Sequence, residues 1–251
     1  DSCLVGSEMC IRDSFNVGVD QTKLTSDKVQ EVLDKVGHII TKCVEHGDLD
    51  IMSLCEFGGH RQGLTAAGKS PKNMKIFHGH LENVVHHLSY LTAWNFNADT
   101  TQFVFQSASS HPLDSEKCDP ELVVVQLQNN VGVRLTLGNL HIRTPHDKKA
   151  PKPLVKKNLV VEALRKMMEI SPADSAAQPV VFVLVGDPNL TKDQGDEAVQ
   201  QLQPPMGSDW NTVWQVHTTS AKKSGDVIFV KGAHADLSLI HISEPTRHES
   251  I

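Results

Sequence analysis

The sequence has no excess of positive charge, and this absence narrows the classes of protein to which it can belong. It carries 24 Lys and Arg against 30 Asp and Glu, for a formal net charge of −6. A general nucleic-acid coat protein would instead show a basic face and a high pI. The acidity still permits a nuclease, because a bound divalent cation supplies local positive charge at a carboxylate site.

Cysteine pairs and long apolar runs are also missing. The five cysteines are Cys3, Cys10, Cys43, Cys55 and Cys118, and no two of them stand in CxxC spacing. The first two fall in an end segment that is interpreted below as non-native, and the three that remain indicate neither a disulfide framework nor a zinc site. No apolar run approaches the roughly 18 residues of a membrane-spanning helix. The sequence therefore predicts no membrane span.

Both ends of the sequence match translated library-adaptor DNA. Residues 4–14 read LVGSEMCIRDS and residues 237–247 read LSLIHISEPTR. One transposase adaptor encodes the first run, and its reverse complement encodes the second. Because fusion scars are set aside before fold reasoning, we expect residues 1–14 and 237–251 to be adaptor-derived and residues 15–236 to form one domain. Amplification of the source transcript should then return different residues before Phe15 and after Asp236.

Residues 15–236 alternate patterns that are typical of strands and helices. Apolar spacings of three and four predict a helix from Ser26 or Asp27 to Gly47 and two further helices over residues 75–91 and 154–170. Apolar runs of strand length predict strands at residues 15–19, 51–55, 102–106, 122–127, 131–142, 180–185, 213–217 and 227–230. This alternation favours one α/β domain in which helices cover the sheets.

Two motifs place polar residues late in apolar strands. In DIMSLCE, Glu56 ends an apolar run, and carboxylate oxygens are ligands that Mg²⁺ prefers. A solvated loop residue is the alternative for Glu56. In GNLHI, Asn139 and His141 lie two apart on one face of a strand, where buried polar groups need partners or a cleft. A hydrogen-bonded core histidine is the alternative for His141.

Three further signals come after strands or in loops. In VVFVLVGDPN, Asp187 and Asn189 follow a buried strand, where a carboxylate can orient a nucleophile and an amide can hold a phosphate oxygen. An ordinary Asp turn is the alternative. Asp226 opens the last strand in SGDVIF. Arg61 follows Glu56 in GGHR, where a guanidinium could bind phosphate in a bidentate manner, with an exposed loop arginine as the alternative.

The order of these motifs, with Asn16 in FNVG before them, resembles the endonuclease/exonuclease/phosphatase superfamily, which has the deoxyribonuclease I-like fold. The resemblance covers nearly all of residues 15–236. It implies two packed, mainly antiparallel β-sheets flanked by helices, a four-layer α/β/β/α sandwich that is incomplete at the C-terminus. Four neighbours of the motif residues differ from the usual family pattern, and they are Cys55 for Gln, Leu140 for Thr, Pro188 for Phe and Val227 for Tyr.

The resemblance also implies roles for the polar residues. Metal binding, to Mg²⁺ or Mn²⁺, falls to Glu56 and Asn16, catalysis to His141, Asp187, Asn189 and Asp226, and substrate contact to Asn139. Substrate contact by Arg61 is expected from its place just after Glu56 and not from the resemblance. The implied reaction is in-line attack of water on a phosphodiester, with nucleic acid as the favoured substrate. The family's closing S-D-H, whose His works with the Asp at position 226, does not occur before residue 237. We therefore expect the chain as written to be nearly inactive.

Two other functions stay open at this point. A phosphatase that acts on inositol phosphates or phospholipids would share the same motifs, because a fold does not settle function. A non-catalytic binding module of the same fold is the third possibility, and the altered neighbours of the motif residues favour it slightly.

Overall fold

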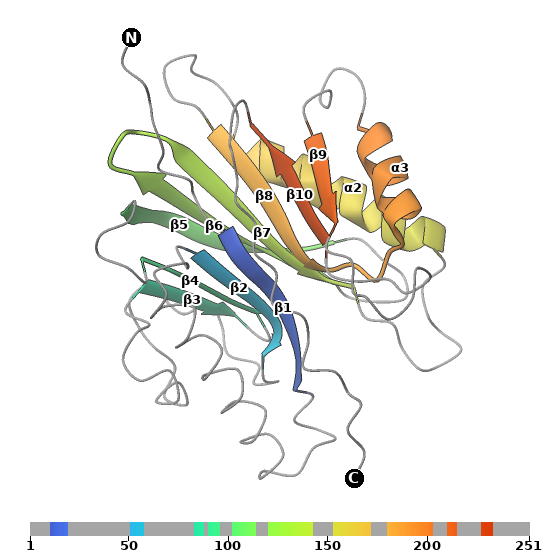
Figure 1. Cartoon of the computed structure of the whole chain (residues 1–251), viewed down its shortest axis with the longest axis horizontal. Helices are drawn as coiled ribbons and strands as arrows, with labels where there is room; N and C mark the ends of the chain where they lie inside the picture. Colours follow the sequence, from blue (N-terminus) through green and yellow to red (C-terminus); the bar gives the residue numbers. More distant parts are fainter. Residues whose placement is uncertain are drawn as a thin grey trace.

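The computed structural model describes residues 11–19, 51–57, 83–87, 90–95, 102–113, 120–142, 153–171, 180–202, 210–214 and 227–232. In these ranges the chain forms two β-sheets and two helices (Figure 1). The predicted α/β fold with two packed sheets is confirmed. Among the described helices, none is long and apolar enough to cross a membrane.

The smaller sheet has four strands in the order β1-β2-β4-β3, and the larger sheet has six in the order β5-β6-β7-β8-β10-β9. The strands of the smaller sheet are β1 (Ile11–Val19), β2 (Ile51–Phe57), β3 (Asn83–His87) and β4 (Tyr90–Trp94). Those of the larger sheet are β5 (Phe103–Pro112), β6 (Glu121–Asn129), β7 (Arg134–His141), β8 (Val180–Asp187), β9 (Trp210–Trp214) and β10 (Val227–Lys231). The pairs β1·β2 and β7·β8 are parallel, and the other six pairs are antiparallel, so the sheets are mainly antiparallel as predicted.

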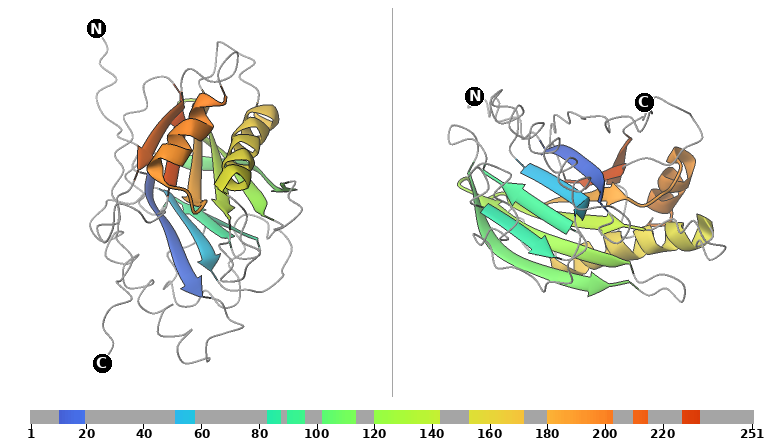
Figure 2. Two further views of the ribbon diagram at one scale, coloured as in Figure 1. Left: turned by 90° about the vertical axis from the view of Figure 1, so that its right-hand side faces the viewer. Right: turned by 90° about the horizontal axis from the view of Figure 1, so that it is seen from below.

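The two sheets pack face to face, with β2 lying over β7 and β8 (Figure 2). An apolar cluster fills the space between them. From the smaller sheet it includes Ile51, Val85 and Trp94, and from the larger sheet Leu135, Leu137, Val183 and Ile228. Strand side chains alternate between the two faces of a sheet, so the residues between these positions on the larger sheet point to its other face.

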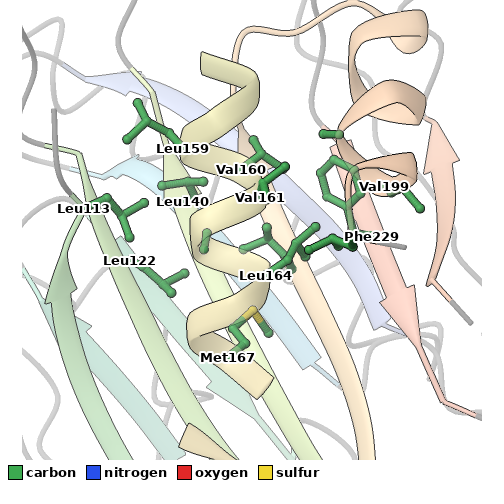
Figure 3. Packing of buried hydrophobic residues seen from close by; sticks show 14 of the residues in the cluster. Leu113, Leu122, Leu140, Leu159, Val160, Val161, Leu164, Met167, Val199 and Phe229 are labelled. Atoms are coloured by element: carbon green, nitrogen blue, oxygen red, sulfur yellow. The ribbon is translucent and has the colours of Figure 1, made fainter. Parts of the chain in front are cut away.

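Two helices cover that other face, α2 (Pro153–Ile170) and α3 (Lys192–Gln200). Figure 3 shows Val160, Leu164 and Met167 of α2 packed among side chains of the sheet. Gly138 on β7 permits this close approach, because a Cβ at that position would meet the Met167 sulfur. The described layers are therefore small sheet, large sheet and helices. The helix predicted to begin at Ser26 or Asp27 lies outside the described residues.

The helix predicted over residues 75–91 is wrong for its described part, because residues 83–87 and 90–91 belong to the antiparallel strands β3 and β4. Val84 and Val85 have the spacing of a helix face, yet both are buried in the sheet, and pairing with β4 overrides the local pattern. Helix α3 was not predicted, although its start carries a capping box between Thr191 and Gln194, which is a recognisable sequence signal.

Several strand boundaries also differ from the prediction. Strand β1 begins at Ile11 rather than at residue 15. Strand β5 continues to Pro112 rather than ending at residue 106. Strand β9 spans Trp210–Trp214 rather than residues 213–217. None of these differences moves a predicted site residue out of its strand.

Candidate active site

The C-terminal ends of β7 and β8 lie side by side, because these strands are parallel neighbours. His141, the last residue of β7, is paired with Asp187, the last residue of β8. Just beyond this pair, the Ile142 amide donates a hydrogen bond to the Asp187 carbonyl oxygen at 3.0 Å. The motifs GNLHI and GDPN therefore meet at one edge of the larger sheet.

Strand β2 of the smaller sheet points to the same edge. Its first residue, Ile51, packs in the apolar cluster with residues from the start of β7. Further along β2, the Leu54 carbonyl accepts a hydrogen bond from Asn139, which lies near the end of β7. Strands β2 and β7 consequently run in the same direction across the space between the sheets.

Glu56 and Asn16, the predicted metal ligands, have backbone positions at this edge. Glu56 lies in β2 two residues after Leu54, and Asn16 of β1 is paired with Cys55, the residue before Glu56. The side chains of Glu56 and Asn16 are outside the described part of the chain. Among the side chains that are described, no group of three His, Cys, Asp or Glu could hold a metal ion.

Two other predicted site residues, Arg61 and Asp226, lie outside the described residues altogether. The residue after Asp226 is Val227, which pairs with Gly186 at the end of β8. Strand β10 therefore begins at the same edge at which β7 and β8 end.

Asn139 is buried between the two sheets, with 2% of its surface exposed. Its Nδ2 donates hydrogen bonds to Ser53 Oγ at 2.6 Å and to the Leu54 carbonyl oxygen at 2.9 Å. An amide nitrogen carries two hydrogens, so these two bonds engage both. Its Oδ1 is buried and has no hydrogen-bond partner among the described residues.

His141 is also buried, with 6% of its surface exposed. Its backbone is held from the opposite sheet by Tyr90 of β4, whose hydroxyl accepts from the His141 amide at 3.2 Å and donates to the His141 carbonyl at 3.5 Å. Sequence reasoning missed Tyr90, the one tyrosine of the chain. No local signal distinguishes Tyr90 from an ordinary strand aromatic.

The GDPN turn has its own hydrogen bonds. Asp187 Oδ1 accepts from the Asn189 amide at 2.9 Å, a side-chain turn of the kind that Asp favours. Asn189 has a φ of 52°, and its Nδ2 donates to the Ile142 carbonyl at 2.9 Å. The Asp turn that was the alternative for this motif is therefore present, and the Asn189 side chain links it to the end of β7.

Lys156 of α2 contacts the same turn from the face of the larger sheet that the helices cover. It is buried, with 7% exposed, and its Nζ donates to the Asn189 carbonyl at 3.2 Å. A lysine near a helix start is usually solvated, so its sequence context gave no sign of this contact. The GDPN turn is therefore held by β7 on one side and by α2 on the other.

A second polar cluster lies towards β5, on the face of the larger sheet that packs against the smaller sheet. His87 Nε2 of β3 is 3.0 Å from Glu121 Oε1 of β6, and the Ser110 hydroxyl of β5 also donates to that carboxylate. Glu121 opens β6 one residue before Leu122, which is paired with Leu140. This cluster thus neighbours the end of β7 and links the two sheets near their β5 side.

Comparisons with known proteins support the fold. No protein-family model and no curated protein sequence matches the chain. Among solved structures, truncated TDP2 from Caenorhabditis elegans is similar with a TM-score of 0.51 and 13% identity, over 88% of this chain and 83% of that one. TDP2 from D. rerio, in complex with a single-strand DNA product, gives a TM-score of 0.50 and 12% identity over the same shares.

A third similar structure is a β-hairpin deletion mutant of beta toxin from Staphylococcus aureus, with a TM-score of 0.52 and 10% identity over 87% of this chain and 88% of that one. At these identities the likeness concerns the fold. Together with the two packed sheets and the order of their strands, it shows that the chain has the predicted deoxyribonuclease I-like fold.

Proposed function

We propose that the chain is a metal-dependent phosphoesterase that hydrolyses phosphodiester bonds by in-line attack of water, with nucleic acid as the favoured substrate. The observation that carries the proposal is the meeting of His141 and Asp187 at one sheet edge, to which β2 brings Glu56. The deoxyribonuclease I-like fold and the three motif residues at one edge together support a phosphoesterase more strongly than either feature alone.

The protein groups have distinct parts in this proposal. Asp187 accepts a hydrogen bond from the Asn189 amide through Oδ1, which restrains a carboxylate that orients the attacking water. His141 donates a hydrogen bond to a phosphoryl oxygen as negative charge develops there. Positioned donors of this kind are usually the largest catalytic term.

The donor set suits a hard divalent cation. Glu56 and Asn16 offer a carboxylate and an amide oxygen, and Mg²⁺ is commonly held by one or two carboxylates while it keeps several waters. When bound, such an ion polarises a phosphoryl oxygen and stabilises the leaving group. Glu56 and Asn16 are the residues that would hold it, and Mn²⁺ would serve as well.

The choice of nucleic acid as the favoured substrate rests on the similarity to a solved structure and on the resemblance of the motifs to the family pattern. The D. rerio TDP2 structure contains a single-strand DNA product, and a nucleic-acid backbone offers the phosphodiester that this chemistry requires. The site would be reached from the edge at which β7 and β8 end.

The test is an assay with Mg²⁺ on single-stranded DNA, double-stranded DNA, RNA and a panel of phosphomonoesters that includes inositol phosphates. It is made on the 251-residue chain and on the reading frame recovered from its source transcript. We expect hydrolysis of a nucleic acid that EDTA abolishes and that Asp187→Asn lowers by about 100-fold or more. The matched control is Asp193→Asn on the exposed first turn of α3, which should retain activity. Turnover of phosphomonoesters alone would favour a phosphatase, and no turnover by the product of the recovered reading frame would favour a binding module.

A further inference from the structure

Besides the His87–Glu121 contact, two sets of hydrogen bonds cross the space between the sheets near the candidate active site. Asn139 of β7 donates to Ser53 Oγ and to the Leu54 carbonyl of β2. Ser53 in turn shares a hydrogen bond of 3.3 Å with Thr92 of β4. All of these side chains are buried, since Ser53 and Thr92 are each 3% exposed.

The second contact returns from β4 to β7. Tyr90 lies two residues before Thr92 on the same face of β4, and its hydroxyl binds both the amide and the carbonyl of His141. The hydrogen bonds therefore form a closed loop from β7 to β2, from β2 to β4 and from β4 back to β7. We call these contacts the cross-sheet bonds of Asn139 and Tyr90.

The cross-sheet bonds lie close to the predicted chemistry. Leu54 is two residues before Glu56 on β2, and Asn139 is two residues before His141 on β7. Apolar contacts such as those of Ile51 are non-directional, so they permit small shifts of one sheet over the other. Hydrogen bonds have preferred distances and angles, and a satisfied buried network specifies one arrangement.

Asn139 is poorly placed to touch a substrate. Both of its amide hydrogens are engaged by β2, and the side chain is 2% exposed. Its Oδ1 is buried without a partner among the described residues, which is a cost that an apolar side chain would avoid. A residue that keeps this cost is better explained by the two directional bonds that it makes than by core packing.

We infer that Asn139 and Tyr90 are positioning residues, which hold the Glu56 end of β2 and the His141 end of β7 at the spacing required for metal and phosphate to be bound together. This inference rests on the proposed function and replaces the predicted substrate contact of Asn139. Mutation of residues that orient metal ligands typically lowers metal affinity or activity by roughly 10- to 100-fold.

The test compares Asn139→Ala, Asn139→Leu and Tyr90→Phe with Thr136→Ala in the product of the reading frame recovered from the source transcript. Thr136 is a matched control because it is buried on β7, is 1% exposed, and its hydroxyl makes no hydrogen bond to a described residue. The measurements are the dissociation constant for Mn²⁺, kcat and KM separately for a DNA oligonucleotide, and hydrogen exchange of the His141 amide.

We expect both Asn139 variants to weaken Mn²⁺ binding and to lower kcat by roughly 10- to 100-fold, with KM changed by less than about threefold. Tyr90→Phe should speed exchange of the His141 amide, because that amide loses its acceptor. Thr136→Ala should leave Mn²⁺ binding and kcat near those of the wild type. Asn139→Leu keeps the branched shape and the number of heavy atoms of the side chain, so it still tests the inference if Asn139→Ala fails to fold.

Three results would overturn the inference. A raised KM with unchanged Mn²⁺ affinity would make Asn139 a substrate contact, and equal effects from the Asn139 variants and Thr136→Ala would make it a structural residue only. Absence of Mn²⁺ binding by the wild type would remove the metal that is to be positioned. Failure of the proposed function can be distinguished from failure of this inference. A wild type that binds Mn²⁺ without hydrolysing any phosphodiester would contradict the proposed activity. The Mn²⁺ affinity of the variants and the hydrogen exchange of the His141 amide would still test the cross-sheet bonds.

Discussion

The hydroxyl of Tyr90 lies 3.2 Å from the amide nitrogen of His141, and the two residues belong to opposite sheets. The pairing of β6 with β7 extends to Leu122 and Leu140. The His141 amide lies one residue beyond that pair, and it finds its acceptor on the tyrosine. A side chain from the smaller sheet thus continues the hydrogen bonding of the larger sheet at the candidate active site.

Tyr90→Phe should lower the free energy of unfolding by about 1 to 3 kcal/mol, because the buried His141 amide loses its acceptor. The ring itself is retained, so its packing against Cys55 and Val123 should change little. Urea denaturation followed by circular dichroism gives the value. A change below about 0.5 kcal/mol would show that water or another group replaces the hydroxyl.

Gly186→Ala should lower the free energy of unfolding by more than about 2 kcal/mol. Gly186 has a φ of 135°, and a Cβ there would overlap the carbonyl oxygen of Leu140 on the adjacent strand. Gly132→Ala is the matched control, since Gly132 also has a positive φ, of 87°, but has open space around its missing Cβ. We expect the control to cost about 1 kcal/mol, from backbone conformation alone. Equal losses in the two variants would contradict the clash with Leu140.

Glu56→Gln should reduce Mg²⁺-dependent hydrolysis by the product of the recovered reading frame by about 100-fold or more, since mutation of even the residues that hydrogen-bond to metal ligands changes activity by roughly 10- to 100-fold. The substitution removes a charge rather than core volume, so circular dichroism should be unchanged. Glu169→Gln, at an exposed ion pair with Lys166, is the control and should be neutral. Full activity of Glu56→Gln at saturating Mg²⁺ or Mn²⁺ would exclude Glu56 as the principal ligand.

His111 should make stability depend on pH. Burial lowers the pKa of His111 below its ordinary value of 6.5, Lys166 lowers it further, and Glu121 opposes the change. As the pH falls below 6.5, the unfolded chain takes up this proton before the folded chain does, so the free energy of unfolding decreases. Above that pH both states hold a neutral imidazole and the contribution is constant.

The measurement for His111 is urea denaturation of the wild type and of His111→Gln at several values from about pH 8 to about pH 5. The stability of the wild type relative to the variant should fall below pH 6.5. If the relative stability stayed constant or rose as the pH fell, the folded state would bind the proton at least as well as the unfolded state, and the assigned direction of the pKa shift would be wrong.

Local sequence was sufficient for the centre of the larger sheet and its helix. The apolar run at residues 180–185 predicted β8, and the spacing of apolar residues over 154–170 predicted α2, because both elements satisfy their periodicity within a few residues. The order of the motifs also indicated the family's fold. The apolar pattern gave the wrong element at Val84 and Val85. Two adjacent apolar residues fit the apolar face of a helix, and they fit equally well a strand that is buried on both sides.

The sequence by itself determined which polar residues lie at or near the C-terminal ends of the strands, since Glu56 and Asp187 follow apolar runs and His141 comes late in a predicted strand. Only the tertiary structure decided which contacts hold those strands in place. Asn139 and Ser53 are 86 residues apart in the chain, and Tyr90 and His141 are 51 apart. Contacts over such separations form only when two sheets pack, and their geometry depends on the registers of both sheets together, which no local pattern contains.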